Sequence, residues 1–394
     1  MSRSEPTPAA GTADPVDAAR RLAATAAELA PEAERRRQLA EPLVSALGEA
    51  GLFRLCVPKA AGGLEVHPGT LTAAVRALAA GDASTAWCVA VGATSGLLAG
   101  YLPEEGVRAL LTAPETMIAG VFAPNGSATA EAGGYRVSGR WPFASGCRHA
   151  DWLMGGCVVD DGGTVRVLPN GMPDVRLVLA PAQTFTIHDT WRVVGLRATG
   201  SHDIELAGVH VPSELSASVF TDPPVQTGPL YAFPLFGLLA LAISSVCLGI
   251  GRGALDDLAA IAGGKVPAGG RRTLAERATV QAEVARAEAA VRAAGALLDE
   301  SIGEAWELAV GSGRVDEPRR AGLRLAATHA ATAGLQATET AYRLGGGSAV
   351  YDSSPLQRRL RDVNAATQHM LVAPATWELT GRQLLGLPTD TTQL

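Results

Sequence analysis

The sequence predicts an α+β protein, mainly helical, in which a helical domain precedes a central β-barrel and a C-terminal helical bundle. Residues 17–112, and the chain from Ala232 onward, are rich in Ala, Leu, Arg and Glu at helical spacing. Residues 113–222 instead hold short β-branched runs separated by Gly, Pro and Asp. A Pro/Gly-rich connector over 221–229 separates the strand-rich segment from the C-terminal helical segment. We therefore expect domains at 17–112, 113–222 and 223–394, after a disordered tail at 1–16.

The first two segments are assigned from local signals. Residues 1–16 have low complexity and no apolar run, so they predict a frayed tail without a targeting signal. In the helical domain, Leu43, Leu47 and Ala50 fall on one helix face, and Gly51 is placed as a helix stop.

Six short runs in about 100 residues predict the strands of a compact barrel or sandwich. They are GGYRVSGRWPFA, DWLMGGCVV, TVRVLP, VRLVLAP, TFTIHDTWRVV and HDIELAGVHVP.

The C-terminal domain is predicted from an apolar stripe and an apolar stretch. The stripe has residues spaced by threes and fours, as expected for a helix in a bundle: Val280, Val284, Ala287, Val291, Ala294, Leu298 and Ile302. Residues 230–251 carry no charge and are long enough to cross a membrane. Because neither flank has a positive cluster, we expect a buried helix and no membrane partner.

The composition excludes several functions. A net charge of −6 argues against nucleic-acid binding, which needs a basic face. The five cysteines form no CxxC pair, so we expect reduced, buried thiols in a cytoplasmic protein. We predict no metal site, because His149-Ala-Asp151 and His202-Asp203 lack a second ligand cluster. GIGRGA (249–254) matches a loose dinucleotide pattern, but its helical context favours close helix packing.

Five segments, in this order, resemble the acyl-CoA dehydrogenase superfamily. They are AGLFRLCVPKAAGG (50–63), GYRVSGRWPFASG (134–146), DTWRVVGLRATGSHDI (189–204), RLGGGSAVY (343–351) and LQRRLRDVNAATQH (356–369). The resemblance covers residues 20 to 388. It implies an N-terminal helical domain, a central β-barrel, a C-terminal four-helix bundle and a bound flavin.

The details are similar to one branch, the oxygenase components of two-component flavin monooxygenases. Dehydrogenases of the superfamily commonly carry a catalytic Glu shortly after an Arg-Asp pair. Here Arg361-Asp362 is followed by no carboxylate before Glu378, and His369 stands near the expected position of the base. The pattern W-x-F-x-SG near the barrel start also fits this branch.

The resemblance implies hydroxylation of an aromatic or heteroaromatic, phenol- or indole-like substrate by molecular oxygen through a flavin C4a-hydroperoxide. The resemblance implies that FADH2, or FMNH2 in its place, comes from a separate NAD(P)H-flavin reductase. A dry pocket protects such a species from decay. His369 is expected to deprotonate the substrate or orient the peroxide, since imidazole titrates near neutral pH. Ser145 is expected to hydrogen-bond near the reactive ring nitrogen.

Further residues take roles by the same resemblance. The cofactor-binding set is Phe122, Trp141, Phe143, Ser145, Gly146, Arg271, Arg272, Gly346 and Gly347, with the arginines reaching the pyrophosphate across a subunit interface. The substrate-binding set is Trp87, Thr94 and His149. Ample apolar helix faces predict a homo-oligomer, expected to be a tetramer.

Two alternatives to the monooxygenase remain open from the sequence. The first is an FAD-dependent dehydrogenase of the acyl-CoA type with a displaced base, which would hold oxidised flavin tightly. The second is a non-catalytic flavin- or ligand-binding protein of the same fold.

Overall fold

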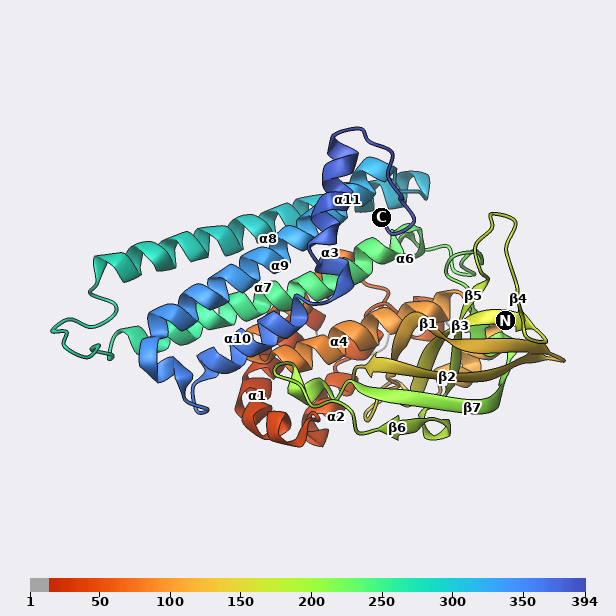
Figure 1. The fold of residues 1–394 in the computed structure, drawn as a ribbon, viewed down its shortest axis with the longest axis horizontal. Helices are drawn as coiled ribbons and strands as arrows, with labels where there is room; N and C mark the ends of the chain where they lie inside the picture. The colour runs from red at the N-terminus through yellow and green to blue at the C-terminus, as the bar shows by residue number, and fades with distance from the viewer. Residues whose placement is uncertain (1–13) are drawn as a thin grey trace, which may run out of the picture.

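The computed structural model describes residues 14–394 and has the predicted order of helices, strands and helices (Figure 1). Residues 1–13 of the predicted tail lie outside this range. The first helix, α1, begins at Pro15, two residues before the predicted boundary, because the Asp14 carboxylate caps it by accepting the Val16 N–H at 2.8 Å. The N-terminal helices are α1 (Pro15–Arg36), α2 (Glu41–Glu49), α3 (Pro68–Gly81), α4 (Ala83–Ser95) and α5 (Glu104–Leu110).

The strands form one curled sheet with the order β6-β7-β2-β1-β3-β5-β8, and β4 pairs with β3. Within residues 14–394 the edge strands β6 and β8 do not pair with each other, so the predicted barrel is a curled but open sheet. The strands are β1 (Ile118–Glu131), β2 (Gly134–Ala144), β3 (Trp152–Asp161), β4 (Thr164–Val165), β5 (Val175–Pro181), β6 (Thr186–His188), β7 (His202–Pro212) and β8 (Ser216–Ala217).

All six predicted runs contain a strand, but β1 was not predicted. This 14-residue strand lies in the middle of the sheet, between β2 and β3. Pro124, Asn125 and Gly126 interrupt it and have the composition of a turn. In the structure they occupy a register shift between Val121 and Gly126, so the strand continues beyond an irregularity.

The C-terminal domain is built on the three long helices α7, α8 and α9, with the shorter α10 packed against α7 and α9 and the sheet at one end of the array (Figure 1). The apolar stripe on α8 faces inward as predicted, with Val284 only partly buried. The helices are α6 (Pro229–Ala232), α7 (Leu235–Ala262), α8 (Ala278–Ser312), α9 (Glu317–Gly345), α10 (Pro355–Ala366) and α11 (Ala375–Leu384).

The segment GIGRGA lies in the middle of α7 and serves close helix packing, as predicted. A Cβ atom added at Gly251 would come within 2.9 Å of the Gly334 Cα on α9. Only a residue without a side chain lets the two backbones approach this closely.

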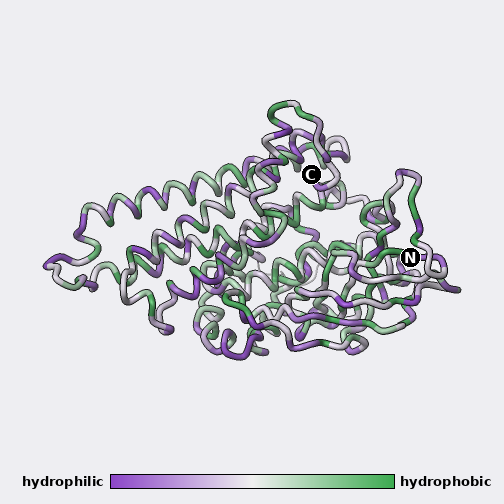
Figure 2. The backbone as a smooth tube through the Cα atoms, viewed as in Figure 1, coloured by the Kyte–Doolittle hydropathy of each residue, from purple (hydrophilic) through white to green (hydrophobic). Residues whose placement is uncertain are grey.

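Two helical stretches, Ala83–Gly100 and Leu235–Ala262, are long and apolar enough to cross a membrane. Their most apolar windows are 94% and 78% buried inside the fold, as expected of core helices. Figure 2 shows the contrast between the apolar course of α7 and the alternation of apolar and polar residues along α8. All five cysteines are buried and free, in agreement with the prediction of reduced thiols.

Candidate active site

Among the predicted site residues, Trp87 contacts both Ser145 and His369, although each of the three comes from a different domain. The indole N–H of Trp87, on α4, donates a hydrogen bond to the Ser145 Oγ at 3.0 Å. The Trp87 ring also contacts the His369 ring in an edge-to-face arrangement, with the two ring centroids 5.8 Å apart. Trp87 therefore joins the two residues predicted to be catalytic.

Ser145 is positioned by a tight turn at the end of β2. Phe143 has a φ of 68°, a left-handed conformation that is uncommon for an aromatic residue, and its side chain is 67% exposed. Gly146 has a φ of 73°, and its N–H donates to the Thr199 carbonyl at 2.8 Å. A Cβ at position 146 would come within 2.7 Å of the Met117 Cε. This turn leaves the Phe143 ring uncovered while the Ser145 hydroxyl is buried.

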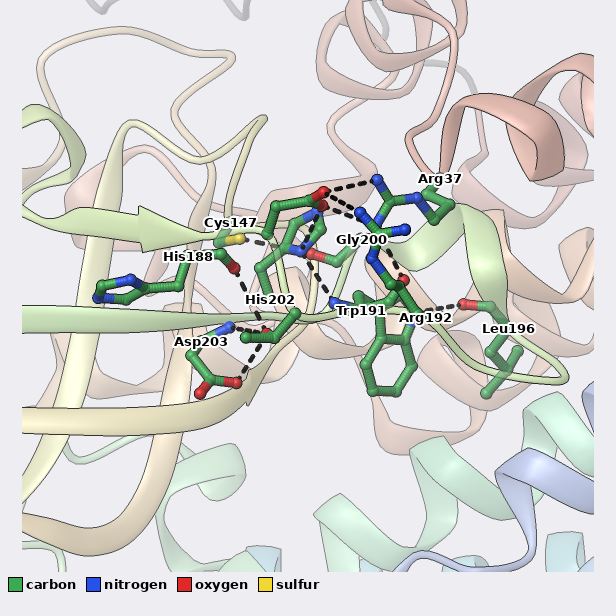
Figure 3. A network of polar contacts seen from close by, with 11 residues as sticks. Arg37, Cys147, His188, Trp191, Arg192, Leu196, Gly200, His202 and Asp203 are labelled. Carbon is green, nitrogen blue, oxygen red and sulfur yellow. Dashed lines mark hydrogen bonds and ion pairs between the residues drawn. The ribbon is translucent and has the colours of Figure 1, made fainter.

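A second turn, formed by residues 189–201, contacts Ser145 through Ser201. The same turn is bound to Arg37, the residue that follows α1 (Figure 3). The Arg37 guanidinium binds both Asp189 oxygens, at 2.6 and 2.9 Å, and this contact holds the pKa of Asp189 at about 2. The buried His202 Nδ1 accepts the Trp191 N–H at 3.2 Å, and the Trp191 indole N–H donates to the Leu196 carbonyl at 3.0 Å. The Trp191 ring also lies edge-to-face against the Phe143 ring, 6.0 Å away.

The same turn is held from the other side by Arg361 and Asp362 of α10. The Asp362 Oδ1 accepts the Leu196 N–H at 2.7 Å, and the Arg361 guanidinium donates to the Val194 carbonyl at 2.7 Å. Burial, reinforced by the charge of Asp82, raises the pKa of Asp362 to about 7. Because α10 also leads to His369, this anchor sets the position of the imidazole relative to Ser145.

His369 differs electrostatically from the prediction. Its Nδ1 accepts the Leu371 N–H at 3.3 Å, so a neutral ring carries its proton on Nε2. Burial, assisted by the positive charge of Arg324, lowers the pKa of His369 to about 4. The expectation that this imidazole titrates near neutral pH is therefore wrong. At pH 7 the residue is a neutral hydrogen-bond donor through Nε2.

Trp141 also requires a correction. Its side chain is fully buried inside the curled sheet, and its indole N–H donates to the Gly156 carbonyl at 2.7 Å. The ring packs directly over Gly126, Gly139 and Gly155, where any Cβ would clash with it. No face of Trp141 is left to cover a flavin, so this residue belongs to the core of the sheet.

The predicted substrate-binding residues other than Trp87 are also located. The Thr94 hydroxyl donates to the Ala90 carbonyl of its own helix at 2.8 Å, so its proton is already used. Both ring nitrogens of His149 are buried without a hydrogen-bond partner, and burial lowers its pKa. Phe122, predicted to contact the cofactor, lies half-buried on β1.

The remaining predicted cofactor residues lie at the opposite end of the bundle from the sheet (Figure 1). Arg271 and Arg272 are exposed in the loop between α7 and α8. Gly346 and Gly347 follow α9, and the Lys265 ammonium links the two segments by binding the Gly345 carbonyl and the Ser348 hydroxyl. One chain therefore brings these two groups together but does not bring them to Ser145.

Two hydroxyl residues beside Ser145 were not predicted. Ser201 contacts the Ser145 Oγ at 2.8 Å, and Thr199 contacts the Ser201 Oγ at 2.6 Å. Both belong to the segment 189–204 that carried the family resemblance. Thr199 and Ser201 lie two and four residues after Arg197, and nothing in the sequence distinguishes them from ordinary turn residues.

The chain is similar to known proteins over most of its length. Residues 14–110 match the family "Acyl-CoA dehydrogenase, N-terminal domain", and residues 241–374 match "Acyl-CoA dehydrogenase, C-terminal domain". Indole-3-acetate monooxygenase from Pseudomonas putida is 33% identical over 90% of this chain and 89% of its own. The oxygenase component of FADH2-dependent resorcinol hydroxylase from Rhizobium sp. (strain MTP-10005) is 30% identical over 90% of both chains.

Two solved structures are similar over nearly the whole chain. The 3-HSA hydroxylase from Rhodococcus sp. RHA1 has a TM-score of 0.89 and 27% identity, and covers 97% of this chain and 100% of its own. XiaF from Streptomyces sp., in complex with FADH2 and glycerol, has a TM-score of 0.87 and 27% identity, with 95% of each chain covered.

The chain therefore belongs to the acyl-CoA dehydrogenase superfamily. Within that superfamily it is a flavin-dependent monooxygenase, of the branch that supplies the oxygenase component. The expected class of enzyme, its fold and its flavin cofactor are confirmed.

Proposed function

We propose that this enzyme hydroxylates a small aromatic or heteroaromatic molecule, phenol- or indole-like, with molecular oxygen and a reduced flavin. The observation that carries the proposal is that Trp87 contacts both the buried Ser145 and the partly buried His369, and so joins all three domains. The substrate class is supported by the names of the relatives, which act on indole-3-acetate and resorcinol. Both molecules contain a ring that is rich in electrons and bears a polar hydrogen.

The residues around Ser145 fit a flavin ring. The exposed Phe143 ring, braced by Trp191, offers an apolar edge for a flat heterocycle. The Ser145 hydroxyl offers a hydrogen bond, and Gly146 permits close approach of the backbone. When bound, the reduced flavin supplies the activated oxygen. Phe122 lies on the neighbouring strand and is proposed to line the same pocket.

His369 and Trp87 are proposed to face the substrate. The neutral imidazole donates a hydrogen bond from Nε2 to the oxygen being transferred or to a substrate oxygen. Trp87 provides an apolar wall beside it and excludes water. His149, whose ring nitrogens have no hydrogen-bond partner, and Thr94 are proposed to border the substrate space.

The assembly is proposed to be a homotetramer whose subunits complete each other's sites. Arg271 and Arg272 lie in the loop between α7 and α8, and Gly346 and Gly347 follow α9; both segments are at the end of the bundle away from the sheet, and Lys265 links them. Guanidinium groups suit a pyrophosphate, and glycines allow close approach. In the proposed tetramer, these residues would reach the flavin of a neighbouring subunit. We also propose that the enzyme works in the cytoplasm.

A separate NAD(P)H-flavin reductase is the proposed source of reduced flavin. Its test is a reconstitution with NADH, a purified flavin reductase, and either FAD or FMN, with indole and phenol as probe substrates. We expect hydroxylated product only when both proteins are present, and no NADH consumption by this chain alone. NADH oxidation by the chain alone would refute the two-component arrangement. Light scattering of the flavin complex tests the tetramer, which a monomer at micromolar concentration would contradict.

A further inference from the structure

Four hydrogen bonds run in series from Trp87 to the backbone of Leu196 through three buried hydroxyl groups. Trp87 Nε1 lies 3.0 Å from the Ser145 Oγ, which lies 2.8 Å from the Ser201 Oγ. The Ser201 Oγ lies 2.6 Å from the Thr199 Oγ1, which lies 2.7 Å from the Leu196 carbonyl oxygen. None of the three hydroxyl residues is more than 5% exposed. We call Trp87, Ser145, Ser201 and Thr199 the hydroxyl relay.

The two ends of the relay fix the direction of every bond in it. The Leu196 carbonyl can only accept, so Thr199 uses its single proton there and must accept from Ser201. Ser201 therefore donates its own proton to Thr199 and must accept a hydrogen bond from Ser145. The Trp87 indole can only donate, which agrees with Ser145 accepting at that side. The Ser145 proton is thus committed to Ser201, and the Ser145 Oγ has one lone pair free.

The relay is rigid, so this polarity does not reverse easily. The Leu196 N–H is held by Asp362 at 2.7 Å, and the Thr199 carbonyl is held by the Gly146 N–H at 2.8 Å. Turning the Ser145 proton outward would leave a buried hydroxyl oxygen of Ser201 without its donor. A buried polar group without a partner is costly, so the outward orientation is disfavoured.

We propose that Ser201 and Thr199 are positioning residues that make Ser145 a hydrogen-bond acceptor toward the ligand, and that this selects reduced over oxidised flavin. The inference rests on the proposed flavin site at Ser145. The central ring of a flavin has a nitrogen that carries a hydrogen when reduced and a bare lone pair when oxidised. An accepting Ser145 bonds the reduced form and opposes the lone pair of the oxidised form.

The test compares the dissociation constants of FAD and anaerobically reduced FADH2 for the full-length protein without substrate. Ser201→Ala frees the Ser145 proton to point at the ligand. One gained or lost hydrogen bond corresponds to about a two- to tenfold change in affinity. We therefore expect Ser201→Ala to tighten FAD binding and to weaken FADH2 binding. The ratio of the dissociation constant of FAD to that of FADH2 should then fall by about fivefold or more.

Two variants separate this effect from a structural one. Ser201→Thr keeps the hydroxyl and is expected to retain the wild-type ratio. Ser244→Ala removes another fully buried serine hydroxyl, which donates to Leu241 within α7, and is expected to leave the ratio unchanged. If Ser201→Ala does not fold, Thr199→Val serves in its place, because it removes the acceptor of the Ser201 proton.

The outcomes are distinct. A reduced ratio in Ser201→Ala or Thr199→Val, retained in Ser201→Thr, supports the relay. An unchanged ratio, or equal weakening of both flavins, overturns it while leaving the flavin site in place. Failure of the wild-type protein to bind either flavin overturns the relay together with the proposed function.

Discussion

Replacing His369 by glutamine and by alanine separates the two roles that its imidazole can have in catalysis. The pKa of His369, about 4, lies roughly 6 units below the pKa of an ordinary phenol. Transfer of a phenolic proton to His369 would therefore cost about 8 kcal/mol. An unperturbed histidine would face only about 5 kcal/mol. A hydrogen bond donated from Nε2 has no such cost, because the Leu371 N–H already directs the ring proton to that nitrogen. The structure therefore favours donation.

Glutamine retains an N–H donor at a similar reach but cannot take up a proton. His369→Gln is expected to keep product formation within about tenfold of wild type, whereas His369→Ala is expected to lose about 10² to 10³-fold, as when a donor to developing negative charge is removed. The assay measures hydroxylated product and hydrogen peroxide per flavin oxidised, and the alanine variant should release more peroxide. Equal loss in both variants would refute the donor role and restore the base.

Three further outcomes are expected. Ionised Asp362 is disfavoured in the folded chain, so the contribution of Asp362 to stability against urea should fall as pH rises from about 4 to about 7, and Asp362→Asn should remove this contribution while leaving the opposite contribution of His369, whose pKa is lowered. Gly251→Leu should cost about 1–3 kcal/mol or more in chemical denaturation, while Gly303→Leu, with no neighbour within 4 Å, should cost under 1 kcal/mol. Trp141→Ala should lower the free energy of unfolding by about 3–5 kcal/mol. Phe143→Ala should instead weaken flavin binding without lowering the melting temperature. The reverse pattern would restore Trp141 as a flavin contact.

Most of the fold follows from local patterns. The stripe on α8 repeats every three or four residues, and the predicted strands alternate, so each is visible within one short window. β1 escaped because Pro124, Asn125 and Gly126 interrupt its pattern, and only pairing with β2 and β3 keeps it extended. The open edge between β6 and β8 depends on contacts between distant segments, which no local pattern reports.

The site was predicted unevenly for a similar reason. The family resemblance assigned both Trp141 and Phe143 to the cofactor, and on a regular strand the two side chains would share one face. The register shift between Trp141 and Ala144, with the left-handed Phe143, sends one ring into the core and the other outward. Such an irregularity has no sequence mark. The depressed pKa of His369 likewise depends on burial by residues remote in the chain.

The electrostatics of the site also discriminate between oxygenation and dehydrogenation. Dehydrogenation of a thioester requires a group that removes a proton from carbon. His369 is a poor choice, because its pKa is about 4 and its Nδ1 is already engaged. Asp362 has a better pKa, about 7, but its carboxylate is buried and accepts the Leu196 N–H. In the proposed roles, these side chains offer a ligand a hydrogen bond donated by His369 Nε2 and an accepting oxygen from Ser145. Such an arrangement would stabilise an oxygen atom under transfer and hold a reduced ring, and it would not abstract a proton from carbon.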